Sequence, residues 1–143
     1  MNLQEVVKTA ANGQPEAEAF LVAWMRWIHL IDDVADGDLH RRNVVQVSRW
    51  ACDLFCCAFF QRYRDNLLPL VQLMACTFED SLDMESSAIK WERDIADVIR
   101  HTGADMIRIV AFITGGYDLM RHISVPLRRL CYQDHHTLDG KPV

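Results

Sequence analysis

Apolar residues recur at three- and four-residue spacing along almost the whole chain, which is the pattern of amphipathic helices. Only six glycines and four prolines are available to interrupt that pattern in 143 residues. No strictly alternating run of apolar and polar residues is bounded by hairpin turn residues. The sequence therefore predicts an all-α protein, a bundle of five to six helices with short loops between antiparallel neighbours.

The predicted helices are separated by glycine, proline, serine and asparagine. They cover residues 3–11, 15–36, 42–64, 65–83, 86–114 and 117–132. We expect Pro69 to lie in the first turn of the fourth helix and Pro126 to disturb the sixth. The length fits a single domain over residues 1–143, with a mobile tail from about residue 133.

Charge and hydropathy argue against several classes of protein. Fifteen basic and twenty acidic residues give a net charge of −5, which argues against a general nucleic-acid binder. The most apolar stretch, residues 19–31, contains Arg26 and His29 and is too short to span a membrane. The amino terminus has no apolar signal-peptide core. We therefore expect a cytoplasmic protein whose five cysteines are reduced and mostly buried.

The predicted helix over 15–36 changes character toward its end. One side is apolar and aromatic, and the other is apolar in its early turns but ionisable in its last two, at His29, Asp33 and Asp36 with Asp32 at the margin. A helix that is apolar nearly all round is central and buried, so the aspartates are predicted at the mouth of an apolar cavity. Close carboxylates repel one another, and Mg²⁺ would offset that repulsion. The alternative is a solvated acidic helix end.

The stretch DDVADGDLHRRN, residues 32–43, resembles the first aspartate-rich motif of the trans-isoprenyl diphosphate synthases, which are class I isoprenoid synthases. That motif reads DDxxD, four further residues, then RRG. The matching positions are Asp32, Asp33, Asp36, Arg41 and Arg42. The resemblance implies an isoprenoid-synthase-like fold in which the aspartates bind Mg²⁺ and the arginines help to bind a diphosphate. It covers the motif and its flanking helices, in a chain about half the usual length of these synthases, and Asn43 replaces the motif's final glycine.

Two further groups of ionisable residues are candidates for a second metal face or for positions around the first. One group repeats the carboxylate spacing of the motif, and the other lies along one side of the predicted helix over 86–114. The candidates are Glu79, Asp80, Asp83, Asp94, Asp97 and His101, together with His29. If the helices over 15–36 and 86–114 are neighbours, these groups would converge on one ion site. The groups on the helix over 86–114 run beside an apolar stripe that includes Trp91, Ile95 and Val98, and so would line the edge of the core. The alternative is a surface stripe with local ion pairs, Asp94 or Asp97 with Arg93 or Arg100.

Three functions remain open from the sequence. The leading one is a small isoprenoid-synthase-like protein that binds Mg²⁺ and a diphosphate-bearing or apolar small molecule. As an enzyme, it would be a Mg²⁺-dependent transferase or lyase acting on an isoprenoid diphosphate. The alternatives are a non-catalytic helical interaction or assembly module, and an all-α Mg²⁺-dependent nucleotide pyrophosphohydrolase. The short length, four tryptophans and an apolar central helix predict a homodimer with an apolar helical interface.

Overall fold

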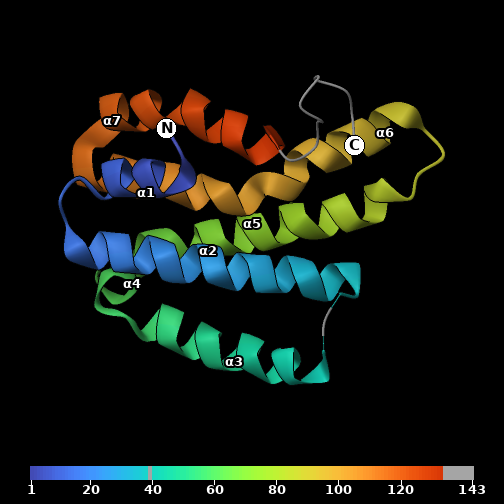
Figure 1. Cartoon of the computed structure of the whole chain (residues 1–143), viewed down its shortest axis with the longest axis horizontal. Helices are drawn as coiled ribbons and strands as arrows, with labels where there is room; N and C mark the ends of the chain where they lie inside the picture. Colours follow the sequence, from blue (N-terminus) through green and yellow to red (C-terminus); the bar gives the residue numbers. More distant parts are fainter. Residues whose placement is uncertain (39, 134–143) are drawn as a thin grey trace. The chain divides into compact units, whose positions relative to one another are not determined.

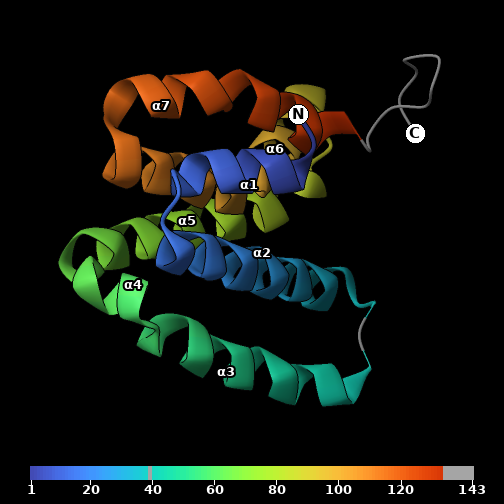
Figure 2. The same cartoon turned by 60° about the vertical axis from the view of Figure 1, so that its left-hand side comes forward.

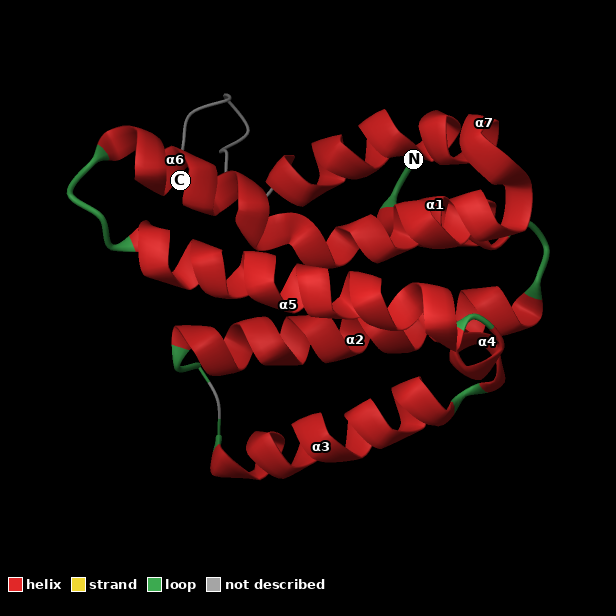
Figure 3. Cartoon of the chain, turned by 180° about the vertical axis from the view of Figure 1, so that it is seen from behind, coloured by secondary structure: helices red, strands yellow, loops and turns green. Residues whose placement is uncertain are grey.

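The computed structural model describes residues 1–38 and 40–133, and within these ranges it contains helices and no strand (Figure 3). The helices are α1 (Leu3–Ala11), α2 (Pro15–Asp36), α3 (Arg41–Cys56), α4 (Ala58–Arg62), α5 (Arg64–Glu85), α6 (Lys90–Ile99), the 3-10 helix η1 (Arg100–Ala104) and α7 (Asp105–Gln133). The all-α prediction is confirmed. The tail predicted to be mobile lies outside the described residues. In the described part of the chain, no helix is both long enough and apolar enough to cross a membrane.

The first helix, α1, begins at a capping box, which is a sequence pattern typical of helix starts. The Asn2 side chain accepts a hydrogen bond from the Glu5 backbone N–H (2.9 Å), and the Glu5 carboxylate accepts one from the Asn2 N–H (2.8 Å). This reciprocal capping box satisfies two backbone donors that the helix cannot satisfy itself. Asn12 ends the helix in the left-handed conformation, with φ 51°. The predicted bounds of α1 and α2 are those observed.

Two predicted helices are interrupted. The one over 42–64 is divided at Cys57, whose extended backbone (φ −68°, ψ 157°) separates α3 from α4. The one over 86–114 begins later, at Lys90, and tightens into η1 before α7. Gly103 lies in η1, where a Cβ atom would meet the Ile28 side chain at 2.7 Å. Apolar periodicity continues through both breaks, so it does not reveal them.

The prolines do not act as predicted. Because α5 already begins at Arg64, Pro69 lies inside the helix and not in its first turn. Pro126 also lies inside α7, where the residue with non-helical dihedral angles is Gly116 (φ 82°, ψ −170°). Figure 2 shows α7 doubling back on itself in its orange part. The predicted helix boundary near residue 116 is therefore confirmed, and it divides α7 into two arms.

The described residues form two compact units, one of residues 1–21 and 104–133, the other of Val22–Gly103 without residue 39. In the first unit α1 packs against α7. The Thr114 hydroxyl donates to the Ala10 carbonyl (2.6 Å), and the Asn12 amide donates to the Thr114 carbonyl (3.0 Å). The buried apolar side chains of these two helices include Val6, Val7, Met106, Ile107 and Val110. Organisation as a single domain stays a prediction.

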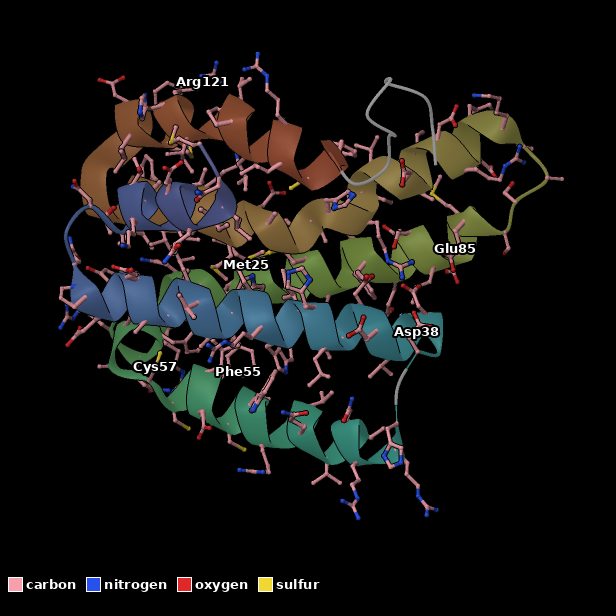
Figure 4. The ribbon with its side chains drawn as sticks, viewed as in Figure 1. Met25, Asp38, Phe55, Cys57, Glu85 and Arg121 are labelled. Atoms are coloured by element: carbon pink, nitrogen blue, oxygen red, sulfur yellow. The ribbon has the colours of Figure 1, made fainter. Side chains whose placement is uncertain are left out.

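In the second unit, α3 and α5 run on opposite sides of the part of α2 that belongs to it (Figure 1). Trp27 joins α2 to α3, since its indole N–H donates to the Val47 carbonyl (3.2 Å) and its ring lies edge-on to Phe55, with centroids 5.4 Å apart. Figure 4 shows Phe55 between these two helices. The Trp24 indole donates to the Gly103 carbonyl (2.7 Å), which ties α2 to η1.

Three predictions about burial are wrong. The cysteines are free, but Cys52, Cys56 and Cys76 are exposed, and Cys57 and Cys131 are half-buried. In α3 the buried residue is Leu54, two residues from both Cys52 and Cys56. Residues two apart lie on different sides of a helix, so both cysteines are directed away from the side that Leu54 buries. In α6, Trp91, Ile95 and Val98 are exposed, as described below. In α2, burial is concentrated in the first half, and Asp33, Val34 and Asp36 are exposed.

Candidate functional site

The aspartate-rich end of α2 meets an arginine from η1. The Arg100 Nε donates to Asp32 Oδ1 at 2.8 Å, and its Nη2 donates to Asp36 Oδ1 at 2.7 Å. The third nitrogen, Nη1, donates to Glu85 Oε2 at 2.8 Å. We call these four residues the Arg100 clamp. Every nitrogen of one guanidinium is therefore bonded to a different carboxylate.

Each member of the clamp is placed by the end of a helix. Asp32 and Asp36 are four residues apart and share one side of α2, Glu85 is the last residue of α5, and Arg100 is the first of η1. The guanidinium also lies over the Phe78 ring of α5, with its carbon 4.8 Å from the ring centroid, in a cation–π contact. Figure 4 labels Glu85 close to the end of α5. The clamp therefore joins the ends of α2 and α5 to the start of η1.

The clamp is most enclosed at its centre. The Arg100 side chain is 15% exposed, whereas those of Asp32, Asp36 and Glu85 are 43%, 46% and 52% exposed. Burial acts to lower the pKa of Arg100, but the hydrogen bond to Asp32 and the charges of the three carboxylates outweigh it and raise that pKa. The guanidinium therefore stays charged. Three carboxylates around one guanidinium leave an excess of negative charge.

The predicted metal and diphosphate residues are distributed as follows. Asp32 and Asp36 come together in the clamp, whereas Asp33 is exposed and lies outside it. Arg41 and Arg42 open α3 with exposed side chains. The cation observed on the aspartates is thus Arg100, from a distant part of the sequence.

The predicted second face is spread over α5, α6 and η1. Glu79, Asp80 and Asp83 are exposed on α5, and Glu85 joins the clamp instead. Asp94 pairs with Lys90 of its own helix at 2.7 Å. The remaining candidates are Asp97 (exposed), His101 (half-buried) and His29 (exposed). Within residues 1–38 and 40–133, no group of three or more His, Cys, Asp or Glu side chains is arranged to hold a metal ion.

Arg100 and Glu85 are the site residues that the sequence reasoning missed. From the sequence, Arg100 is a candidate only for a local pair with Asp94 or Asp97, in the alternative of a surface stripe. The sequence carried no signal for its place in the clamp, because Arg100 is four residues after Ala96, on the side of α6 opposite the apolar stripe, and only the structure shows that this side is the inner one. An arginine directed inward needs carboxylate partners, since an unpaired buried charge is costly.

Comparisons with protein-family models, with curated proteins and with solved structures give no match for this chain. The resemblance to the isoprenyl diphosphate synthases therefore rests on the motif residues alone.

Proposed function

We propose that this protein is a non-catalytic helical assembly module and that its acidic cluster has a structural role. The observation that carries this proposal is the Arg100 clamp. Asp32 and Asp36, the residues with the strongest resemblance to a metal motif, are bonded to an arginine of the same chain. Charge-assisted hydrogen bonds from a guanidinium to several carboxylates are among the stronger polar contacts in proteins. In this arrangement the aspartates stabilise the fold.

A second line of support is the number of large apolar side chains left on outward faces. They occur on several helices of both units, although a soluble monomer rarely exposes contiguous apolar surface beyond a modest patch. Examples are Val45, Trp91, Val98, Phe112 and Tyr117, each more than half exposed. Association with another polypeptide would remove such surface from water.

Sedimentation velocity over the micromolar range tests this function. We expect the wild-type chain to associate reversibly into a homodimer, with the sedimentation coefficient rising as the concentration rises. A monomer at every concentration would contradict the proposal of self-assembly.

A second candidate is Mg²⁺-dependent binding of a diphosphate, as the resemblance to isoprenoid synthases implies. One observation favours it: the hydrogen bonds of the clamp engage one oxygen of each carboxylate and leave an excess of negative charge. Carboxylate oxygens are the ligands that Mg²⁺ prefers. Asp32 and Asp36 fit such an ion only if the guanidinium leaves them, and Arg100, Arg41 and Arg42 would then be available to the phosphate oxygens.

Calorimetry separates the two candidates. Pyrophosphate is titrated into the wild-type chain with Mg²⁺ at millimolar concentration, and the titration is repeated with Asp32→Asn/Asp36→Asn and with Arg41→Ala/Arg42→Ala. As an assembly module, the wild type gives no saturable heat. A saturable, Mg²⁺-dependent heat that both variants lose, and that the control Arg49→Ala retains, would establish the diphosphate site instead. Arg49 is a matched control because it is an exposed arginine of the same helix as Arg41 and Arg42.

A further inference from the structure

The most amphipathic helix of the second unit turns its apolar side outward. Trp91, Ile95 and Val98 recur at the spacing i, i+4, i+7, which aligns them along one side of α6. Their exposed fractions are 60%, 41% and 54%. Ala96, on a different side of the helix, is buried. We call Trp91, Ile95 and Val98 the α6 stripe.

Polar contacts at both ends of α6 hold this orientation. Before the helix, the Ser87 hydroxyl donates to the Glu92 carboxylate, and the Arg93 Nη1 donates to the Ser87 carbonyl (2.8 Å). Directly after it, Arg100 is fixed by the three carboxylates of the clamp. A rotation of α6 that buried the stripe against α5 would break both sets of contacts. These contacts therefore hold α6 with its apolar stripe on the surface of the second unit, where a partner could bind.

We infer that the α6 stripe is the surface through which two copies of this chain form an antiparallel, two-fold symmetric dimer. This inference rests on the proposed assembly function and names its interface. A second copy is the occupant that the charges favour. Lys90, Asp94 and Asp97 recur at the spacing i, i+4, i+7 along one edge of the stripe, so this edge is basic at its start and acidic from its second turn onward.

Antiparallel pairing of two α6 helices places opposite charges together. Lys90 of each copy then faces Asp97 of the other, on one side of an apolar contact in which Trp91 of one copy lies beside Ile95 of the other. A parallel pairing would instead set lysine against lysine and aspartate against aspartate. The antiparallel pairing also brings the two Asp94 carboxylates close together near the axis, where each is already paired with Lys90 of its own chain. An ammonium has three donors and so has capacity for a second carboxylate. A two-fold axis satisfies both ion pairs at once.

Sedimentation velocity of the full chain tests the surface. We expect Ile95→Glu to weaken the wild-type dimer by about tenfold or more, because it places a charge at the centre of an apolar interface. The matched control is Leu73→Glu, which alters an apolar side chain of α5 that is 61% exposed, and it should leave the dimer intact. Circular dichroism should show wild-type helix content in both. If Ile95→Glu unfolds the chain while Leu73→Glu does not, the stripe is covered within the chain and the inference is wrong.

Charge reversal tests the orientation. Lys90→Glu and Asp97→Lys should each weaken the dimer, and the double variant should restore it, because each new glutamate then faces a new lysine. A double variant as weak as the single ones would overturn the antiparallel arrangement. A dimer that is insensitive to Ile95→Glu would overturn this interface and leave the assembly function standing, whereas a wild-type monomer would overturn both.

Discussion

At Arg100 a single side chain satisfies carboxylates from two helices and stacks on an aromatic ring of one of them. From the sequence, Asp32 and Asp36 could be chosen as a cluster that needs a positive charge. Which cation supplies that charge could not be predicted, because Arg41, Arg42 and a divalent cation are all chemically suitable. A helical wheel gives the side of the helix on which an arginine lies, but not what that side faces. That information belongs to the packing of the helices.

Removing the arginine should destabilise the fold. Arg100→Ala deletes three charge-assisted hydrogen bonds and leaves three carboxylates facing one another. We expect a loss of about 1–3 kcal/mol in the free energy of unfolding, kept moderate because the carboxylates are nearly half exposed. Arg100→Lys should recover only part of it, since an ammonium lacks the planar fork. Urea unfolding measures the free energy of unfolding of both variants, at a protein concentration below that at which the chain associates. If Arg49→Ala, at an exposed arginine, costs as much as Arg100→Ala, the clamp does not stabilise the protein.

Cys131 should be the least reactive of the thiols compared here. Burial raises the pKa of the Cys131 thiol and the charge of Asp105 raises it further, while Arg128 partly opposes them. A raised pKa means less thiolate at neutral pH, and the thiolate is the nucleophile. Iodoacetamide should therefore alkylate Cys131 of the native chain more slowly than the exposed Cys52 and Cys76, as followed by peptide mass spectrometry. The alkylation rate at Cys131 should rise only at higher pH. In urea, where the chain is unfolded, the three cysteines should be alkylated at equal rates. Equal rates in the native chain would contradict this prediction.

At the scale of the elements, the sequence predicts most of the helices. The positions of α1, α2 and the division of α7 follow from caps, a proline and the Gly115–Gly116 pair. The break at Cys57 and the 3-10 turn at Arg100–Ala104 are not predictable in the same way. Neither has a glycine or proline at its first residue, and apolar spacing continues through both.

The bend in α7 depends on one backbone conformation. Gly116 has φ 82° and ψ −170°, a region that is almost exclusive to glycine. Nothing lies within 4 Å of the position of a Cβ atom there, so a side chain would meet no steric barrier except that of its own backbone. We expect Gly116→Ala to lower the free energy of unfolding by about 1–3 kcal/mol.

A D-alanine at position 116, introduced by chemical ligation, is the control for this prediction. A D-residue tolerates positive φ, so it should retain wild-type stability in thermal unfolding. A loss of the same size for both enantiomers would place the cost in the added methyl group and not in the backbone.

At the scale of the whole molecule, the sequence predicts the class but not the grouping of the helices. The division into two units separates α1 from most of α2, its immediate neighbour in sequence, and places α1 with α7. Helical periodicity reports which side of a helix is apolar. It does not report what covers that side. In α6, the ionisable groups beside the apolar stripe are predicted to line the edge of the core, but the stripe itself is exposed.

Thermal stability should depend on the concentration of the protein. If folding is linked to dimer formation, the melting temperature rises with concentration by mass action, by about 2 °C for each tenfold increase in a chain of this size. Ile95→Glu should abolish that dependence and Leu73→Glu should retain it, as measured by differential scanning calorimetry. A wild-type melting temperature that is independent of concentration would show that folding and association are not linked.

The clamp has a consequence for the order of events in folding. Arg100 is 68 residues from Asp32 and 64 from Asp36, whereas the helices themselves are made of local contacts. Closing so long a loop is entropically slow and becomes favourable only once α2 and α5 are formed. We expect the clamp to form after the rate-limiting step, so that Arg100→Ala accelerates unfolding and leaves the refolding rate nearly unchanged in stopped-flow urea experiments. The lifetime of the folded chain would then depend on one arginine that contributes almost nothing to how fast the chain folds.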